Sequence, residues 1–430
     1  MKFNINKWTL GLAAVGAVSM ASAVRADDAP KLSPVQTALS STVISGYVSA
    51  SANYEANQTV PNAAGLNSIG STIPLQGGKA NGFNLDVVKL SISKAQDDST
   101  WAAGYEADLL IGPDAVGWNP SPGGGGELSI QQAYVVLRTP VGTGIDWKIG
   151  VFNTVVGYES FDAASNPNYT RSWGFAVEPT EHTGILGTYK VCDELSVSAG
   201  IANTLIAGIN ARNTYNSPAL QNSGAWNKTF MGSATFSAPS SWGWASGSAL
   251  YAGMVYGFGG GHKATFGPTM GTQGGNQVNY YAGATLNSPW KDVTFGAAFD
   301  YVQNLGGNSI ATGIFPSGAP YVHLNDYVWG LYNTIKATDK LSFNTRAEYW
   351  DVDAISNFPH VNGADTGVSL TETVEYDLWA NVVSRVEVRY DKVMTGSYGN
   401  NASVGYYNPA GTRLGSLTSL GVYANVVYKF

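Results

Sequence analysis

Apolar and polar side chains alternate in segments of about ten residues, and this pattern most limits the folds open to the chain. In the stretch that begins at Trp101, the apolar Trp101, Tyr105 and Leu109 alternate with Glu106 and Asp108. Neighbouring side chains of a β-strand point to opposite faces, so each such segment predicts a strand with one apolar and one polar face. The expected strands are 42–54, 83–94, 101–111, 128–138, 144–152, 183–191, 195–203, 227–237, 247–257, 277–286, 293–302, 326–336, 341–350, 367–378, 381–391 and 418–430.

The connections between the expected strands alternate between short and long. Residues 140–143 and 337–340 form short connections, whereas 153–182 and 204–226 form long ones. Bacterial outer-membrane barrels have short periplasmic turns and long outer loops, and strands of about ten residues suit a tilted membrane crossing. The predicted fold class is therefore all-β: a closed antiparallel transmembrane β-barrel of about 16 strands, with a margin of two.

Composition agrees with a surface that is apolar outside and polar inside. Charged residues make up only 12% of the chain and aromatic residues another 12%. A secreted β-sandwich or propeller is the alternative, but its packed core would have to bury the polar face of nearly every strand. No stretch of 18 apolar residues predicts a membrane helix, and a net charge of −7 without a basic patch argues against nucleic acid as a partner.

The beginning of the chain has the features of an export signal. Lys2 and Lys7 precede an apolar run of small residues from Leu10 to Ala23, followed by Ala-x-Ala-like cleavage sequences. We therefore expect a signal peptide at 1–26, a short periplasmic segment at 27–41 and the barrel at 42–430.

The last strand brings an aromatic residue to the end of the sequence. Its apolar face includes Tyr428 and Phe430. This arrangement resembles the C-terminal assembly signal of bacterial outer-membrane barrels. The resemblance implies that Tyr428 and Phe430 are read by the barrel assembly machinery, and we expect this strand to close the barrel against 42–54.

Motifs for catalysis or metal binding are missing from the sequence. It contains no G-x-S-x-G, H-E-x-x-H, CxxC or Walker sequence, and its four histidines share no local spacing. The single Cys192 leaves no intramolecular disulfide. We expect no enzyme activity, no cofactor and no metal site.

Charged residues fall on the polar faces of many strands, which predicts a wet interior. In lipid, a midplane Arg or Lys would cost about 2–4 kcal/mol. These ions could form a transverse field that screens solutes, or they could pair across strands and stiffen the wall. The pore-lining candidates on the strands are Glu106, Asp108, Lys148, Arg346, Glu348, Arg385, Glu387 and Arg389.

Three expected strands have ambiguous faces: 128–138, 247–257 and 367–378. In the last of these, Glu372 would lie among Leu370, Val374 and Tyr376, which leaves the register or the limits of that strand open.

The segment 150–184 carries a family resemblance. Its sequences Gly157-Tyr-Glu159, Asn166…Tyr169-x-Arg171-Ser and Pro179-x-x-His182-Thr-Gly resemble the OmpL-like β-barrel porins of bacteria. Two later sequences, Arg346-Ala-Glu348-Tyr and Arg385-Val-Glu387-Val-Arg389, resemble late strands of the same family. The likeness covers most of the mature chain and implies an outer-membrane barrel, without naming a solute.

The same segment contains the third long loop, of about 30 residues. Long loops without secondary structure are usually functional, so its charged residues Glu159, Asp162, Arg171 and Glu178 are candidates for a constriction. Folding into the lumen would narrow the pore. The alternative is a loop on the outer surface that is held by aromatic packing.

Together these features predict a bacterial outer-membrane porin, a water-filled channel for passive diffusion of small hydrophilic solutes and ions. A substrate-selective channel is the alternative, and an adhesin or enzyme that acts through its loops is a third. The expected partners are outer-membrane lipid, the solutes, the assembly machinery and further copies in a homotrimer.

Overall fold

The structure is a computed structural model of the full chain. It describes residues 41–56, 73, 75–76, 79, 81–97, 99–116, 128–205, 209, 228–258, 276–303, 325–352, 365–395 and 418–430. Apart from residue 41, the predicted signal peptide and the 27–41 segment lie outside the described residues, and so do most residues of several long connections.

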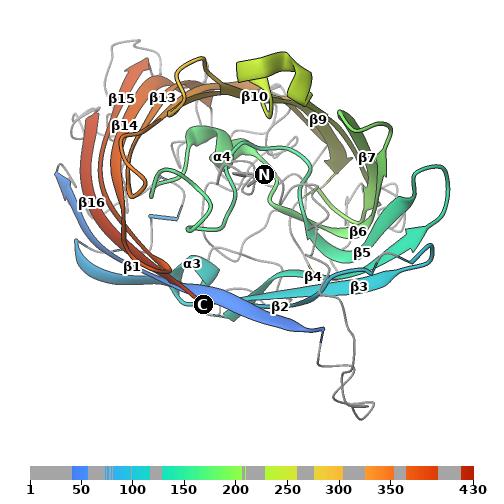
Figure 1. The fold of residues 1–430 in the computed structure, drawn as a ribbon. Helices are drawn as coiled ribbons and strands as arrows, with labels where there is room; N and C mark the ends of the chain where they lie inside the picture. The colour runs from blue at the N-terminus through green and yellow to red at the C-terminus, as the bar shows by residue number, and fades with distance from the viewer. Residues whose placement is uncertain are drawn as a thin grey trace, which may run out of the picture.

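Sixteen strands form one closed antiparallel barrel, in which every strand pairs with its neighbours in sequence and β1 pairs with β16 (Figure 1). This confirms the predicted fold class and strand count. The strands are β1 (Val43–Ala56), β2 (Gly82–Lys94), β3 (Ala103–Ile111), β4 (Leu128–Thr139), β5 (Ile145–Asn153), β6 (Glu181–Lys190), β7 (Leu195–Ala202), β8 (Thr229–Ser237), β9 (Ala249–Phe258), β10 (Asn276–Asn287), β11 (Val293–Gln303), β12 (Asn325–Lys336), β13 (Leu341–Val352), β14 (Asp365–Trp379), β15 (Val382–Thr395) and β16 (Thr418–Lys429).

The period-2 pattern separates the two faces of the wall. Leu331, Val386 and Val426 are exposed on the outside, whereas Arg346 and Arg389 are fully buried inside. Strand limits follow the predictions within a few residues. The largest difference is at the end of β15, which runs to Thr395 rather than to residue 391.

The three ambiguous strands have separate physical causes. In β4 the register shifts opposite Asp108 and Leu109, so the alternation changes phase within the strand. In β9 both faces are apolar, because Val255 points inward and joins a buried apolar cluster. In β14 the predicted register is correct, and Glu372 lies on the outer face with Leu370 and Val374.

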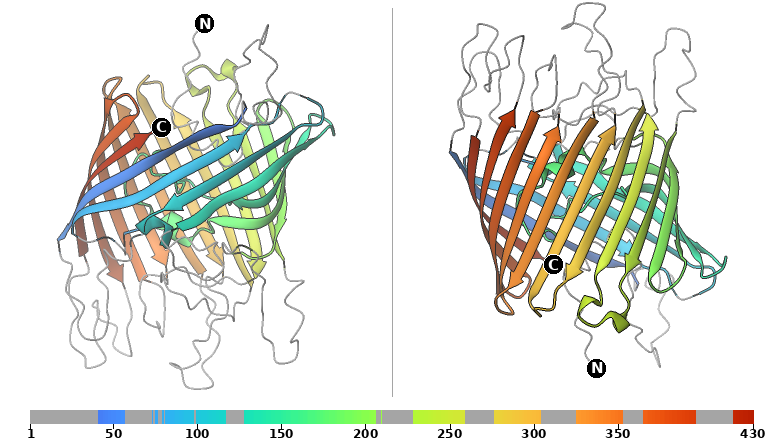
Figure 2. Two further views of the ribbon diagram at one scale, coloured as in Figure 1. Left: turned by 90° about the horizontal axis from the view of Figure 1, so that it is seen from below. Right: turned by 90° about the horizontal axis from the view of Figure 1, so that it is seen from above.

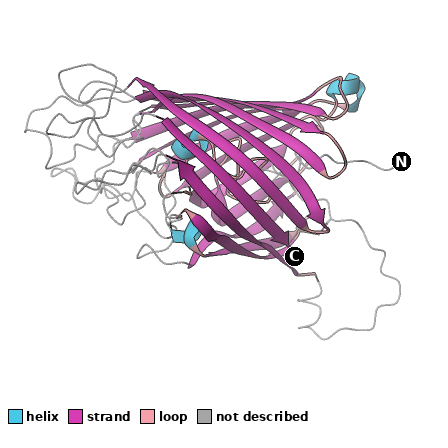
Figure 3. Ribbon diagram, turned by 90° about the vertical axis from the view of Figure 1, so that its left-hand side faces the viewer, coloured by secondary structure: helices cyan, strands magenta, loops and turns pink. Residues whose placement is uncertain are grey.

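The described short connections gather at one end of the barrel (Figure 2). The turn between β8 and β9 at this end contains a short 3-10 helix, η3 (Ser240–Ala245), which projects beyond the strands (Figure 3). In the part of the chain that the structure describes, no helix has the length and apolar character needed to cross a membrane.

Strands β1 and β16 close the barrel through a register that ends at Gly46 and Phe430. The amide N–H of each residue donates to the carbonyl oxygen of the other, at 3.0 Å in both directions. A side chain at Gly46 would meet the Phe430 ring, so this glycine provides the space over which the ring packs. Phe430 and Tyr428 lie on the outer face, and each side chain is about half exposed.

Candidate functional site inside the barrel

The connection between β5 and β6 folds into the barrel and lies against its inner wall. We call residues 154–180 the inner loop; in Figure 1 it is the green segment in the middle of the barrel that contains helix α4 (Trp173–Val177). Ser172 caps this helix, since its hydroxyl oxygen accepts a hydrogen bond from the Phe175 amide at 3.0 Å. Of the two placements considered from the sequence, the chain adopts the one inside the lumen.

Apolar side chains hold the inner loop from two sides. One cluster joins Val155, Val156 and Tyr158 to inward-facing residues of β5 to β12, such as Val255. Tyr158 stacks on Tyr332 with ring centroids 4.1 Å apart. A second cluster packs Phe161, Ala163 and Phe175 against Tyr47, Val87, Leu110, Ala115 and Val427. The inner loop and the wall therefore share two buried apolar clusters.

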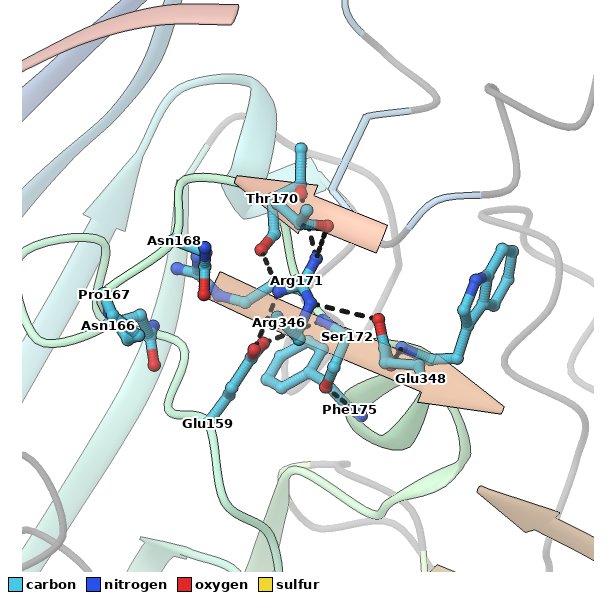
Figure 4. A network of polar contacts seen from close by, with 12 residues as sticks. Glu159, Asn166, Pro167, Asn168, Thr170, Arg171, Ser172, Phe175, Arg346 and Glu348 are labelled. Atoms are coloured by element: carbon cyan, nitrogen blue, oxygen red, sulfur yellow. Dashed lines mark hydrogen bonds and ion pairs between the residues drawn. The ribbon is translucent and has the colours of Figure 1, made fainter. Parts of the chain in front are cut away.

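Arg346 of β13 is the centre of a polar network that joins wall and loop (Figure 4). Its Nη1 donates to Glu159 at 2.8 Å and to the Thr170 carbonyl oxygen at 2.7 Å. Its Nε lies 3.0 Å from Oε2 of Glu348, an ion pair without the alignment of a hydrogen bond. Glu348 in turn accepts from the Trp173 amide at 2.6 Å. Arg346 thus binds side chain and backbone of the loop at once.

Two arginines of β15 bind backbone carbonyl groups of the inner loop. Arg385 donates to the carbonyl oxygens of Ala163 at 2.7 Å and Asn166 at 2.8 Å. Arg389 donates to the carbonyl oxygen of Arg171 and pairs with Asp391 at 2.8 Å. A guanidinium presents several donors in a rigid plane, which suits it to adjacent carbonyl groups of an irregular segment.

Glu387 lies between these two arginines and binds backbone N–H groups instead. Its carboxylate accepts from the amides of Tyr169 at 2.6 Å and Thr170 at 3.0 Å, and from the Thr170 and Thr373 hydroxyls. Donors and acceptors of the loop backbone are therefore matched by opposite charges on one strand. This satisfies polar groups that burial would otherwise leave unpaired.

Asp162 connects the loop to a second part of the wall, formed by β2 and β3. Lys89 of β2 donates to this carboxylate at 2.8 Å and also pairs with Asp108 of β3 at 3.0 Å. The Asp162 side chain is 19% exposed, whereas those of Glu159 and Arg346 are at most 1% exposed. Among the charged pairs of the loop and wall, this one is the more accessible to water.

Arg171 and Glu178 are buried rather than turned to open space. Arg171 donates to the carbonyl oxygen of Tyr169 at 2.9 Å and to that of Phe161, and its guanidinium lies 6.0 Å from the centre of the Phe175 ring. Glu178 lies beside Asp300 of β11. Both residues are at most 5% exposed, so they brace the inner loop.

Lys148 and Glu106 are less deeply buried than the arginines that bind the inner loop. Both side chains are half-buried. The Lys148 ammonium is 4.8 Å from the centre of the Tyr134 ring, and Glu106 accepts a hydrogen bond from Ser91 at 3.1 Å. Sequence reasoning placed these two on the same inner face as the arginines, but it could not separate covered from less covered positions.

A further ionic cluster was missed from the sequence. Lys79 lies 3.0 Å from Asp86 and 3.1 Å from Asp114, and it donates to the Tyr169 hydroxyl at 3.1 Å. Burial raises the pKa of Asp114 to about 6, with Lys79 lowering it in part. Lys79 follows a Gly-rich polar stretch and Asp114 belongs to α3 (Pro113–Val116), so no strand alternation marks either of them.

The described residues contain no group of three or more His, Cys, Asp and Glu side chains that could hold a metal ion. The interior contains fixed charges instead. Charged side chains of the wall bind the backbone and the carboxylates of the inner loop, and these contacts hold the loop inside the barrel.

Three solved structures share this architecture at low sequence identity. The outer-membrane channel DcaP of Acinetobacter baumannii has a TM-score of 0.57 at 12% identity, with 90% of this chain and 97% of that one covered. An anion-selective porin from Comamonas acidovorans gives 0.55 at 12%, with 91% and 99% covered. OmpF of Salmonella typhi in complex with daunomycin gives 0.52 at 11%, with 90% and 97% covered. These likenesses show the fold.

No curated protein matches the chain. A family model described as "Putative beta-barrel porin-2, OmpL-like" matches residues 41–424 and so spans nearly the whole barrel. The match includes the inner loop and the charged residues of β13 and β15 that bind it. The chain therefore belongs to the OmpL-like β-barrel porin-2 family.

Proposed function

We propose that this protein is an outer-membrane channel through which small hydrophilic solutes and ions diffuse passively, narrowed by the inner loop. The observation that carries the proposal is the binding of that loop by wall charges, above all by Arg346 and Glu387. A segment fixed across a lumen reduces the section open to solutes without any moving part or cofactor. Passive diffusion requires no catalysis, so the proposal includes no enzyme activity.

The groups that a passing ion meets are those that the loop leaves accessible. Lys148, Glu106 and the partly exposed Asp162 fit this role, since they are more accessible than the arginines that hold the loop. In a narrow passage of low dielectric, even a few fixed charges select among ions. The deeply buried Arg346, Arg385 and Arg389 act instead by holding the loop, and Arg171 and Glu178 by stiffening it.

The proposed location and partners rest on the apolar outer face and on the two ends of the sequence. The apolar outer face is in contact with outer-membrane lipid, after export through a cleaved signal peptide at 1–26. Phe430 and Tyr428 serve as the signal for the barrel assembly machinery, and the finished protein is a homotrimer. One structural neighbour, OmpT of Vibrio cholerae, is described in a trimer form.

Single-channel recording in planar bilayers tests the proposal. Purified protein should give discrete current steps, and the absence of steps from folded protein would refute a channel. Currents that rise in proportion to concentration for unrelated solutes support general diffusion. Currents that saturate with one class of solute would favour the alternative, a substrate-selective channel.

Ion selectivity tests the residues. Lys148→Glu should make the channel more selective for cations, which is measured as a shift of the reversal potential in a salt gradient. Lys291→Glu is the matched control, because it makes the same charge change on an exposed turn between β10 and β11. Equal shifts in the two variants would show that Lys148 has no special place in the conduction path.

A further inference from the structure

Three polar side chains form a row across the outer face of the barrel. Asn333 of β12 is paired in register with Thr345 of β13, and Thr345 with Glu372 of β14. The Thr345 hydroxyl donates to the Glu372 carboxylate at 2.9 Å. We call these three residues the outer polar row. They lie on the face that elsewhere presents Leu331, Phe343 and Leu370.

Glu372 occupies the middle of its strand, not an end. Leu370 and Val374 flank it along β14, and its partner on β15 is Val388; these three side chains are between 42% and 48% exposed. Other outward-facing polar side chains of the described strands, such as Thr183, Ser384 and Asp351, lie beside a strand end, where the membrane interface supplies water. Glu372 has apolar surface on all sides except that of Thr345.

A carboxylate in this position is poorly satisfied by lipid. It can accept about four hydrogen bonds, and the structure provides one from Thr345. Hydrocarbon offers no donor, and polar groups within a membrane are costly unless protein surrounds them. The outward-facing lysines Lys94 and Lys392 lie at or near strand ends, and no ion pair joins either of them to Glu372 within the described wall.

We infer that the outer face of β12 to β14 is covered in the membrane by a second copy of this chain. Copies in one membrane share an orientation, so each residue lies at the same depth as its equivalent in the neighbour. The outer polar row spans about 10 Å, two strand spacings, and carries an amide and a hydroxyl as donors beside the carboxylate. It therefore offers both an acceptor and a donor to a second copy: the Asn333 amide of one copy can donate to Glu372 of the next, while the Thr345 hydroxyl stays bonded to Glu372 of its own chain.

The inference deepens the proposed assembly by naming the face where copies meet. It rests on the proposed membrane location of the outer face, and it does not depend on which solutes the channel passes.

Disulfide cross-linking in native outer membranes tests it. In a Cys192→Ser background, Glu372→Cys should form cross-linked multiples of the chain mass on mild oxidation. Ala199→Cys is the control, since Ala199 is exposed on the outer face of β7, on the far side of the barrel (Figure 1). The expected result is a several-fold higher cross-linked fraction for position 372. Equal fractions, or a cross-link to a protein of another mass, would overturn a second copy as the occupant.

The oligomeric state of a second variant covers the case in which the cysteine disturbs the contact. Glu372→Leu makes the face compatible with lipid, so the variant should fold but dissociate to monomers in mild detergent. Ser384→Leu, a change of the same kind beside a strand end, should leave the oligomer intact. A Glu372→Leu protein as oligomeric as the wild type would overturn the inference. Conductance measured on the monomers separates this failure from failure of the proposed channel.

Discussion

Arg346 illustrates what a charge does inside a barrel when protein rather than water surrounds it. Its guanidinium is fully buried and reaches Glu159, Glu348 and the backbone of Thr170. Bringing an ion pair out of water is costly, and its partners must recover that cost through close contacts. Once such a network exists, removal of one member leaves the others charged, buried and unpaired.

Replacement of Arg346 should therefore be far more damaging than replacement of an accessible arginine. Arg346→Met is expected to lower the free energy of unfolding by about 3–5 kcal/mol, since Glu159 and Glu348 lose their partner. Arg138→Met is the control: its pair with Asp146 is 2.8 Å long, but the Arg138 side chain is 29% exposed. That variant should lose about 1 kcal/mol or less. Urea unfolding in detergent or lipid measures both, and similar losses would contradict the network.

Asp114 links stability to pH. Its folded-state pKa of about 6 lies above its ordinary value of 3.8, so the folded protein favours the protonated carboxyl. The stabilisation is complete below about pH 4 and is lost as the pH rises through 6, a loss of about 2–3 kcal/mol. Asp114→Asn cannot ionise and should be less sensitive to pH by that amount. The free energy of unfolding of both proteins is measured at pH 4 and pH 7. If the difference between the two pH values is the same in the variant as in the wild type, Asp114 does not have this role.

The sequence predicts on which face of the wall a side chain lies, but it does not predict which atoms that side chain binds. Period 2 places Arg385 and Glu387 on the inner face, and both lie there. The groups that they bind are backbone atoms of the inner loop, up to 222 residues away in sequence. No local pattern records such a contact. Its position in a long charged loop makes Arg171 a candidate for the constriction, yet carbonyl groups of the same loop accept its hydrogen bonds.

At the scale of elements, the inner loop is held mainly by one face of two strands. β13 and β15 supply Arg346, Arg385, Glu387 and Arg389, while apolar contacts fill the space between. A strand in a sheet is rigid and places its inward side chains at a regular spacing. Contacts with these side chains fix the conformation of the irregular inner loop. The loop is therefore ordered by the wall and not by its own short helix.

Weakening of one tether should alter the current before it alters the fold. Glu387→Gln keeps the shape of the side chain but replaces one acceptor oxygen by a donor, which faces loop N–H groups. We expect a larger and noisier single-channel current. Glu375→Gln is the matched control on β14, since Glu375 contacts Arg385 at 2.9 Å and is only partly buried. Identical currents from the two variants would show that the tether does not limit conduction.

For the molecule as a whole, the seam between β1 and β16 removes the last free sheet edges. Phe430 ends that seam through two backbone hydrogen bonds with Gly46 and through its ring. Lipid cannot satisfy an open edge, so a weakened seam affects insertion first.

Removal of Phe430 should reduce the amount of folded barrel in the outer membrane several-fold, while molecules that do insert conduct as before. Phe430→Tyr keeps an aromatic ring and should insert normally. The heat-modifiable band of the membrane fraction on a gel measures insertion, and planar bilayers measure the current. Normal insertion of the truncated chain would refute the role of this residue.

The tethering of the inner loop also has a consequence in time. The inner loop precedes in the chain the residues that hold it. The Thr170 carbonyl oxygen binds Arg346, 176 residues later, and the Ala163 carbonyl oxygen binds Arg385. Contacts between such distant segments form late, because the intervening chain must first be ordered. We therefore expect the wall to be nearly complete before the inner loop takes its final place, so that the barrel first forms with a wider lumen in which these arginines are still uncovered.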